Sequence, residues 1–344
     1  MTATPPDPEE PAGLFGDALP APTKKLPVDA AAPSEDVIEV GARLPQGLYL
    51  GTSSWSFPGW AGLVYGSGAS ESVLSRKGLA AYSRHPVLRA AGIDRGFYSA
   101  LTRAEFAAYA QQVPASFRFL VKAPATVTDA SVRGENGRVT GENEGFLDAR
   151  LACELFVEPA TTGLEANAGP LVFQFSPLPR KLLAEPQRFA DALYGFLKFL
   201  PKGPLYAVEI RDAEVLTEGL MQALADNNAR YCFGVHPRLP GLPAQAKLAS
   251  LLPPGPTVAR WNLHAGYRYE EAKANYAPFN RLVDPDPRTR KHLAQLAMRA
   301  LVIHQPAFIV ANNKAEGSAP LSCVELAREV ETLAEEKRGA GATF

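Results

Sequence analysis

The sequence predicts an α/β protein that folds as a closed (β/α)8 barrel in a single domain. From Leu48 onward, eight short apolar runs of strand length alternate with helical patterns, which predicts a parallel sheet with right-handed crossovers. No GxGxxG motif follows the first run, so an open dinucleotide-binding sheet is disfavoured. A chain of 344 residues that is 46% hydrophobic can bury one large core, and barrels of ~250 residues commonly form one domain.

Each predicted strand is a short apolar run that ends in polar or aromatic residues. The first run, from Leu48, passes directly into a loop of Gly, Ser, Trp and Pro at residues 51–60. A weaker run precedes the aromatic pair Phe97-Tyr98. The other six strands are expected at residues 117–124, 171–177, 205–212, 231–237, 258–266 and 308–314.

Helical periodicity is visible between these runs. Phe189, Leu193, Phe196 and Leu200 recur at i, i+3 or i, i+4 spacing, as on one apolar face of a helix. Segments 134–145 and 266–286 form longer excursions, and loops of that length often cover a site. The predicted helices span residues 74–88, 103–112, 146–156, 187–200, 214–227, 245–252, 288–303 and 321–337.

Residues 1 to about 44 are expected to form a disordered tail, and residues 45–338 the barrel domain. The tail is rich in Pro, Ala, Asp and Glu, and this composition buries too little apolar surface to offset chain entropy. No run approaches the ~18 apolar residues of a membrane span, and the tail lacks a secretory pattern. Three well-separated cysteines without CxxC spacing suggest neither disulfides nor a zinc knuckle. We therefore expect a cytoplasmic protein without a membrane partner; the oligomeric state is left open.

Charged side chains are expected inside the barrel at the end of the predicted strand 205–212. Side chains alternate along a strand, so Glu209 and Arg211 share one face, opposite Val208 and Ile210. If the apolar pair packs on the helices, Glu209 and Arg211 point inward, where a charge needs a partner, water or ligand. A structural ion pair and a ligand-binding pair are both open.

Four other strand ends place polar side chains on the predicted inner face. Arg260, Asn262 and His264 alternate with Trp261 and Leu263. A barrel brings the C-terminal ends of its strands to one rim, where barrel enzymes place their chemistry, so we expect these residues to meet. The remaining members of this predicted rim are Lys122, Gln174, Asn312 and Asn313.

Each rim residue has a chemical interpretation and a structural one. His264 could act as a general acid or base because its unperturbed pKa is ~6.5, and Glu209 could orient it. Lys122, Arg211 and Arg260 could clamp a phosphate or carboxylate, or they could neutralise Glu209 and Asp94.

Aromatic residues and metal ligands give weaker signals. Trp55, Trp60 and Tyr98 could stack on a sugar ring or a base, or pack at the rim. Only His236, Glu209 and His264 suggest metal ligands, and no HExxH spacing occurs. No cofactor is therefore predicted, with a divalent metal left open.

Several segments, in this order, resemble the YecE-like family, number seventy-two in the series of domains of unknown function. The resemblance runs from about Leu48 to Val330. Its most specific pieces are GTSSWSFPGW at residues 51–60, FY at 97–98, VKAP at 121–124 and VEIR at 208–211. That family looks like a TIM barrel, so the resemblance implies the fold predicted above, whereas the biochemical activity of the family is not established.

The chain departs from the family pattern at the end of the second predicted strand. The family usually has Glu-x-Asn before the Phe-Tyr pair, whereas this chain has Gly92 and Asp94 at those positions. A mechanism that needs the Glu would depend on Asp94 or on another acidic residue here.

Three functions follow from this sequence. The first is a barrel enzyme, isomerase-like or hydrolase-like, that acts on a small polar, anionic substrate at the C-terminal rim. The second is a nucleic-acid-binding or nuclease-like barrel, although a net charge of -1 supplies no global attraction. The third is a non-catalytic scaffold, favoured if Glu209 and Arg211 form a dry pair with no cavity above them. The candidate catalytic residues are Glu209 and His264, and the candidate binding residues are Trp55, Tyr98, Lys122, Gln174, Arg211, Arg260, Asn262, Asn312 and Asn313.

Overall fold

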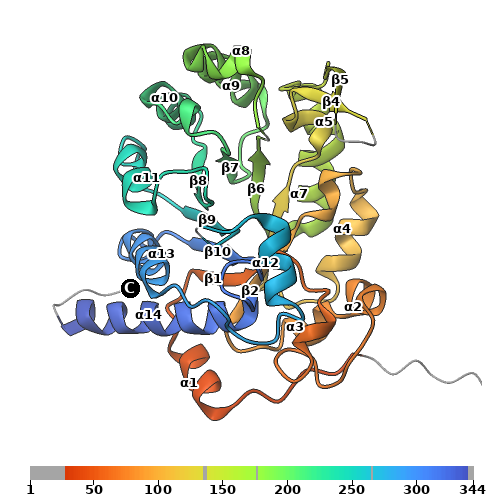
Figure 1. The fold of residues 1–344 in the computed structure, drawn as a ribbon, viewed down its shortest axis with the longest axis vertical. Coiled ribbons are helices and arrows are strands. Elements are labelled where there is room, and N and C mark those ends of the chain that lie inside the picture. Colours follow the sequence, from red (N-terminus) through yellow and green to blue (C-terminus); the bar gives the residue numbers. More distant parts are fainter. Residues whose placement is uncertain (1–27, 135–137, 176, 265, 340–344) are drawn as a thin grey trace, which may run out of the picture.

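The computed structural model describes residues 28–134, 138–175, 177–264 and 266–339. Eight parallel strands close into a barrel in the order β1-β10-β9-β8-β7-β6-β3-β2 (Figure 1). This confirms the predicted (β/α)8 barrel. The strands are β1 Leu48–Thr52, β2 Leu88–Ile93, β3 Arg118–Lys122, β6 Ala168–Gln174, β7 Tyr206–Glu209, β8 Arg230–Val235, β9 Thr257–Trp261 and β10 Ala307–Ala311.

Helices surround the barrel, and the apolar face predicted around Phe189 and Leu193 is buried in α9. Across the described ranges, no helix combines the length and the apolar composition that a bilayer span requires. The α-helices are α1 Glu35–Arg43, α2 Glu71–Lys77, α3 Leu79–Tyr82, α4 Arg103–Ala110, α5 Ala125–Thr128, α6 Ala149–Ala152, α7 Glu158–Leu164, α8 Arg180–Leu183, α9 Pro186–Phe199, α10 Glu218–Asp226, α11 Leu242–Ala249, α12 Tyr269–Tyr276, α13 Pro287–Leu301 and α14 Ala319–Gly339.

The barrel strands separate two apolar layers. Val208 and Ile210 belong to the large core between the strands and the helices. A smaller core fills the inside of the barrel, as expected from the alternation of side chains along each strand. It consists of Leu120, Val172, Ala207, Cys232, Val258, Phe308 and Val310.

The predicted end of the disordered tail, at about residue 44, lies beyond the point where ordered structure begins. Residues 1–27 lie outside the described residues, but α1 forms within the segment predicted to be disordered. Val40 of α1 is buried, and Arg43 and Asp36 form ion pairs with Glu331 and Arg328 of α14. Contacts with a distant helix therefore order a segment whose composition predicts disorder.

Three other predicted segments differ in detail. The helix predicted for residues 74–88 is divided at Gly78 into α2 and α3. Helix α3 ends at Tyr82 and β2 begins at Leu88; Pro86 disfavours helical backbone at the residue before it. The excursion at 134–145 contributes to an antiparallel hairpin of β4 Ser131–Arg133 and β5 Val139–Glu142. The excursion at 266–286 contains α12.

Helix α12 packs beside the loop that follows β9. Ala272 and Tyr276 of α12 form a small core with Leu263, and Tyr276 Oη donates a hydrogen bond to Asp284 Oδ2 at 2.7 Å. In Figure 1, α12 lies in front of the barrel strands near β9 and β10. The excursion therefore holds a helix close to the C-terminal ends of these strands.

Gly51 allows close contact between β1 and β2. A Cβ atom at this position would lie 2.0 Å from the carbonyl oxygen of Ala90, where the register of the two strands shifts. We expect Gly51→Ala to lower the free energy of unfolding by about 1–3 kcal/mol, because overpacking forces the strands apart. Urea unfolding measures this change.

Gly195→Ala in α9 is the matched control for Gly51→Ala. Apart from the adjoining backbone of α9, no heavy atom would lie within 4 Å of the added Cβ atom, so this substitution should raise the free energy of unfolding by about 0.5–1 kcal/mol. If Gly51→Ala were as stable as the wild-type protein, the close approach of β1 and β2 would be unimportant for stability.

Candidate functional site

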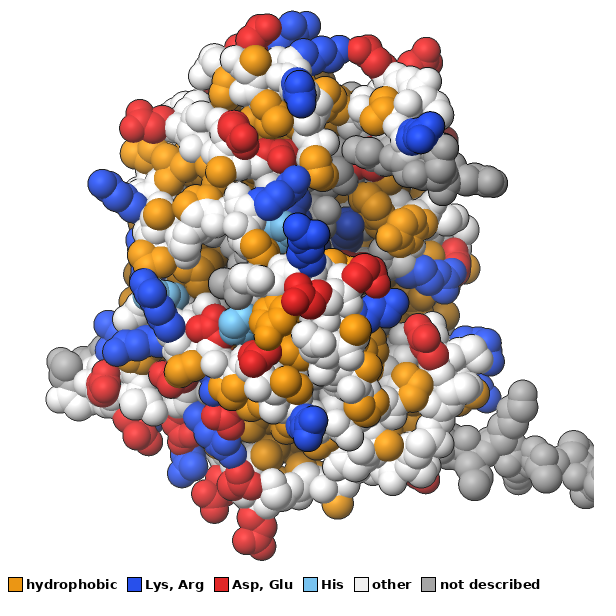
Figure 2. All heavy atoms as spheres, viewed as in Figure 1, with side chains coloured by type: hydrophobic (Ala, Val, Ile, Leu, Met, Phe, Trp, Pro, Cys, Tyr) orange, Lys and Arg blue, Asp and Glu red, His pale blue; other side chains and the backbone are white. Residues whose placement is uncertain are grey.

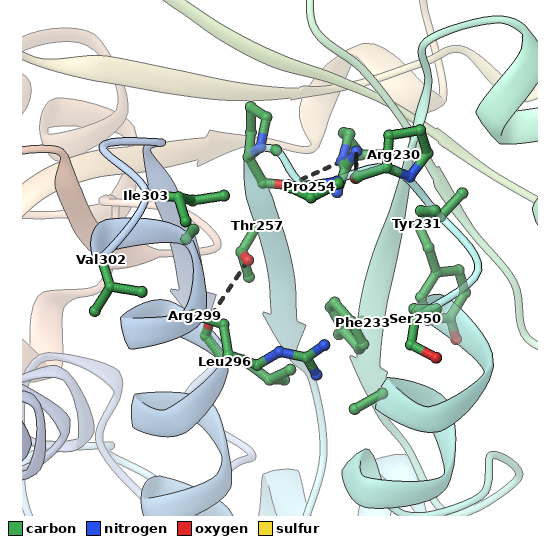
Figure 3. Close-up of a pocket in the computed structure, with 17 residues that line it drawn as sticks. Arg230, Tyr231, Phe233, Ser250, Pro254, Thr257, Leu296, Arg299, Val302 and Ile303 are labelled. Carbon is green, nitrogen blue, oxygen red and sulfur yellow. Dashed lines mark hydrogen bonds between the residues drawn. The ribbon is translucent and has the colours of Figure 1, made fainter.

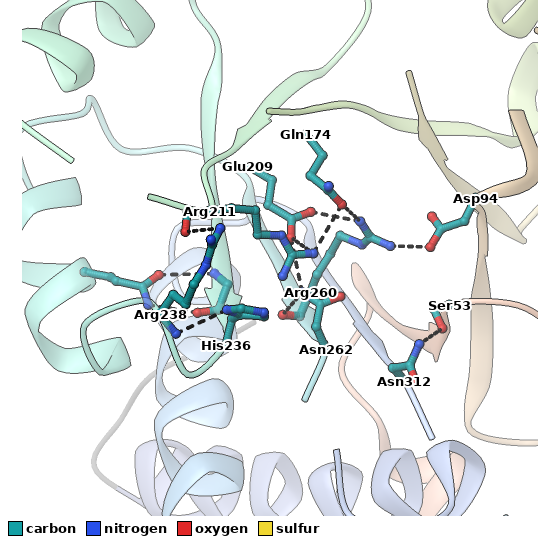
Figure 4. A network of polar contacts seen from close by, with 12 residues as sticks. Ser53, Asp94, Gln174, Glu209, Arg211, His236, Arg238, Arg260, Asn262 and Asn312 are labelled. Atoms are coloured by element: carbon teal, nitrogen blue, oxygen red, sulfur yellow. Dashed lines mark hydrogen bonds and ion pairs between the residues drawn. The ribbon is translucent and has the colours of Figure 1, made fainter. Parts of the chain in front are cut away.

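The side chain of Glu209, at the end of β7, is fully buried and accepts contacts from three donors. Its Oε2 atom accepts a hydrogen bond from Arg260 Nη1 at 2.9 Å. Its Oε1 atom lies 2.7 Å from Arg211 Nη2 and accepts a hydrogen bond from Asn262 Nδ2 at 3.2 Å (Figure 4). Both carboxylate oxygens are therefore engaged within the protein.

The pKa of Glu209 lies below its ordinary value. Burial alone would raise this pKa, but the charges of Arg211 and Arg260 and the hydrogen bond from Arg260 outweigh that effect. Glu209 stays ionised at neutral pH. The geometry thus makes it an anchor for two arginines, which agrees with the structural ion pair that the sequence analysis left open.

Arg260 connects the ends of four strands. Besides Glu209, its Nη1 atom donates to Gln174 Oε1 at 3.1 Å, and its Nη2 atom lies 2.5 Å from Asp94 Oδ2. Arg211 Nη2 also donates to Gln174 Oε1, at 3.2 Å. We call Glu209, Arg260, Arg211, Gln174, Asn262 and Asp94 the rim network.

Asp94 supplies a carboxylate next to the position where the family pattern has Glu. A Cβ atom at Gly92 would lie 2.9 Å from the carbonyl oxygen of Ser53, so the present backbone leaves little room for a side chain there. Asp94, two residues further on, pairs with Arg260. Asp94 is therefore the carboxylate that follows β2 in this chain.

Lys122, the last residue of β3, differs from the arginines of the network. Its Nζ atom lies 3.4 Å from the centre of the Phe97 ring, and in the described part of the chain no carboxylate lies within 4 Å of it. Burial lowers the pKa of Lys122 to about 8, while the nearby carboxylates raise it and the nearby arginines lower it further, so that these charges largely oppose one another. Lys122 can therefore gain or lose a proton close to neutral pH.

A cavity of about 570 Å³ opens above the rim network, at the C-terminal ends of the strands. We call it the mouth cavity. Figure 2 shows basic side chains gathered around a hollow near the middle of this face. Seven of the predicted site residues line the mouth cavity: Tyr98, Lys122, Gln174, Arg211, Arg260, Asn262 and Asn312.

Seven residues that the sequence analysis did not place in the site also line the mouth cavity: the apolar Phe97, Pro177 and Leu263 and the polar Asp94, His236, Arg238 and Tyr269. Arg238 Nη2 lies 3.4 Å from Asp212 Oδ1 and donates to the carbonyl oxygen of Arg211 at 3.1 Å. The signal for Arg238 was its place directly after the His-Pro end of a predicted strand. Tyr269 comes from α12, inside the predicted excursion.

Three predicted site residues lie away from the mouth cavity. Trp55 is 5% exposed, donates its indole N–H to the carbonyl oxygen of Ser75 at 3.3 Å and packs against Tyr109. Asn313 is buried, and its Oδ1 atom accepts a hydrogen bond from Trp60 Nε1 at 3.2 Å. Both side chains therefore fix the loops behind the rim and present no free face to a ligand there.

His264 lines an adjacent cavity of about 710 Å³, together with His236 and His292. Its backbone N–H donates to the carbonyl oxygen of Lys314 at 2.9 Å, and its ring packs edge-on against Tyr267. Among the described residues, no group of three or more His, Cys, Asp or Glu side chains has an arrangement that could hold a metal ion.

A third cavity, of about 380 Å³, lies at the amino ends of β8 and β9, bordered by α11 and α13 (Figure 3). Arg230 donates hydrogen bonds to the carbonyl oxygens of Pro253 at 2.8 Å and of Pro256 at 2.9 Å. Its guanidinium group therefore fixes a proline-rich loop. Arg299, which is exposed, also lines this cavity and provides a reference position far from the mouth cavity.

Comparison with known proteins identifies relatives of the same fold. The family model described as "Protein of unknown function DUF72" matches residues 49–342. A DUF72 family protein from Enterococcus faecalis V583 is similar in structure, with a TM-score of 0.55 and 16% identity over 82% of this chain and 95% of that chain. One from Thermotoga maritima MSB8 has a TM-score of 0.53 and 20% identity over 83% and 99% of the respective chains. No curated protein matches the sequence.

Glu209→Gln should destabilise the protein by about 3–5 kcal/mol at neutral pH, because it leaves Arg211 and Arg260 without their shared counter-ion. Folding lowers the pKa of Glu209, so its stabilising effect is present above the ordinary pKa of ~4.3 and is lost as the pH falls below it. Urea unfolding of both proteins between about pH 7 and pH 3 measures the difference.

The matched control for Glu209→Gln is Glu142→Gln, which removes an exposed partner of Lys181. We expect no measurable change, because solvent screens such pairs. A difference between Glu209→Gln and the wild-type protein that stayed constant down to pH 3 would contradict an ionised, paired Glu209.

Lys122→Met should raise the stability of the protein at pH 7. Burial lowers the pKa of Lys122 to about 8 in the folded state, below the ~10.4 of an unfolded chain. The stability of the wild-type protein should therefore increase as the pH rises from about 8 to ~10.4, and the advantage of the methionine variant should disappear. Thermal melts over this range measure the difference, and a variant less stable at pH 7 would argue against a destabilised ammonium group.

Proposed function

We propose that the mouth cavity is the active site of this chain, which belongs to the DUF72 family of proteins of unknown function. The protein is a barrel enzyme that binds a small substrate bearing a phosphate or carboxylate group. Arg211 and Arg238 hold the anionic group, and Lys122 moves a proton at the reacting centre.

The observation that carries the proposal is an excess of positive charge in the mouth cavity. Asp94, Glu209 and Asp212 pair with the three arginines that line it. Lys122 is the remaining cation, and in the described ranges it has no carboxylate partner within 4 Å. A cavity with one uncompensated cation favours an anionic ligand. The cations that line it are Lys122, Arg211, Arg238 and Arg260.

Arg211 has donors available for such a ligand. Its Nη2 atom contacts Glu209 and Gln174, whereas its Nε and Nη1 atoms make no hydrogen bond to any residue that the structure describes. The ion pair with Glu209 fixes the guanidinium plane. A phosphate or carboxylate can then bind without first ordering the arginine side chain.

Two groups at the mouth cavity suit proton transfer. Lys122, with a pKa of about 8, can donate or accept a proton near neutral pH. Burial, with the charges of Arg211 and Arg238, lowers the pKa of His236 to about 4, so its ring is neutral. Its Nδ1 atom accepts a hydrogen bond from the backbone N–H of Arg238 at 3.2 Å, which assigns the proton to Nε2. His236 can thus donate a hydrogen bond to a substrate oxygen.

The same geometry bears on the other two functions. The scaffold function assumed a dry Glu209–Arg211 pair with no cavity above it, but Arg211 lines the mouth cavity. The nucleic-acid function assumed stacking by Trp55, Trp60 and Tyr98; the two tryptophans are buried, and Tyr98 is 89% exposed. A small anionic substrate therefore agrees best with the site.

Arg211→Lys should weaken the binding of the anionic ligand by about 10-fold to 150-fold. It retains a positive charge beside Glu209 but removes donors of the planar guanidinium group, and a hydrogen bond between charged groups contributes about 1.5–3 kcal/mol. Thermal melts against sugar phosphates, sugar acids, nucleotides and short single-stranded oligonucleotides, with and without Mg, Mn or Zn ions, identify the ligand. Titration calorimetry then measures its affinity for each variant.

Arg299→Lys, at the third cavity, is the control for the ligand measurement and should bind like the wild-type protein. Equal affinities of Arg211→Lys and the wild-type protein would refute the proposed role of Arg211. The proposed function itself would be refuted if no compound in the panel bound, or if the loss occurred in Arg299→Lys instead.

A further inference from the structure

Lys122 has the surroundings of a reactive amine. It is half-buried at the end of β3 and faces the mouth cavity. Its Nζ atom lies over an aromatic ring and not beside a carboxylate. Asp94, a neighbouring acid, is held by Arg260 Nη2 at 2.5 Å. Asp94 and Glu209 act on the lysine charge only from a distance, and within the described residues no carboxylate lies within 4 Å of the Nζ atom.

We propose that Lys122 forms a covalent imine with the carbonyl carbon of an anionic aldehyde or ketone, such as a sugar phosphate in its open-chain form or a 2-oxo acid. This inference rests on the proposed function, because Arg211 must hold the anionic group of the same substrate. It adds a covalent step and names the functional group on which the enzyme acts.

The step balances without an oxidant or a reductant. The lone pair of the neutral Nζ atom attacks the carbonyl carbon, and the carbonyl oxygen takes up a proton to give a carbinolamine. The carbon–oxygen bond then breaks, water leaves and the nitrogen lone pair forms the C=N bond. Protonated, this imine withdraws electrons from the adjacent carbon, so a neighbouring C–H or C–C bond breaks more easily.

The protein provides the conditions that this step needs. An amine reacts only in its neutral form, and the lowered pKa of Lys122, about 8, supplies that form near neutral pH. Burial is the main cause of the lowering; Arg260 and Arg211 add to it, while Asp94 and Glu209 oppose it. Burial and cationic neighbours are known means of activating a lysine. The cavity of about 570 Å³ has room for a small substrate beside the amine.

Lys314 offers a matched comparison on the same rim. Lys314 is buried, and its Nζ atom lies 4.0 Å from the centre of the Tyr269 ring. However, this Nζ atom donates a hydrogen bond to Asn312 Oδ1 at 3.3 Å, and Lys314 is not among the residues that line the mouth cavity. Two lysines that both lie over aromatic rings thus differ in their burial and in their access to a ligand.

Reductive trapping tests the imine. The full chain is incubated with pyruvate or with dihydroxyacetone phosphate, reduced with cyanoborohydride and analysed by intact mass and peptide mapping. We expect one adduct per chain, on Lys122, at least tenfold more abundant than on any other lysine. Lys122→Arg should lose this adduct, and Lys314→Arg should keep it.

The pH dependence of trapping in the unaltered protein gives a second measurement, which does not depend on how the variants fold. The rate should reach half its maximum near pH 8, whereas an exposed lysine would require about pH 10.4. Adducts spread evenly over the lysines, or half-maximal trapping near pH 10.4, would overturn the imine.

The trapping result is separable from the test of anion binding. If Arg211→Lys weakens ligand binding but no adduct forms on Lys122, the imine is wrong and the proposed function remains. If no anion binds and no adduct forms, both are wrong.

Discussion

The buried ion pair between Glu209 and Arg260 is the contact on which the rest of the site depends. Closing the barrel brings the ends of β7 and β9 into one interior, where an unpaired charge would be strongly destabilising. Glu209 is fully buried and holds two arginines through its two oxygens. Because Arg260 is fixed in this way, its second nitrogen reaches Asp94 and Gln174 is oriented by both arginines. The position of each polar group above the pair follows from that anchor.

The interior of the barrel is arranged in layers that follow the two-residue period of the strands. Along β7 and its continuation, Ala207 lies in the apolar inner core, Glu209 forms the ion pair and Arg211 lines the mouth cavity. Along β9, Val258 lies in the same apolar inner core, and Arg260, two residues further on, forms the ion pair with Glu209. The apolar layer excludes water from below, which strengthens the ion pair above it. The ion pairs of Glu209 therefore lie directly below the mouth cavity, and the apolar inner core lies below them.

The sequence predicted the barrel and the inward residues well, because both follow from local rules. Strand periodicity decides which side chains face inward, and barrel closure then brings Lys122, Gln174 and Arg260 together. It could not place Trp55 or His264, because their positions depend on how loops fold back on the core. It also missed α1, whose ion pairs reach a helix almost three hundred residues away. Arg238 and Tyr269 were also missed, since both lie beyond the strand ends, Arg238 in a loop and Tyr269 at the start of α12.

The pairing of the carboxylates with the arginines decides which side chain of the site can take part in proton transfer. A carboxylate between two arginines does not accept a proton near neutral pH, so Glu209 serves as the anchor although it is the most buried acid of the rim. Asp94 could have neutralised Lys122, but Arg260 holds its carboxylate instead. The Nζ atom of Lys122 lies over the Phe97 ring, and burial lowers the pKa of this amine. Among the described residues, Arg260 thus holds both Glu209 and Asp94, and no carboxylate lies within 4 Å of the Lys122 amine. An amine with a lowered pKa suits the proton transfer and the attack on a carbonyl group that we propose.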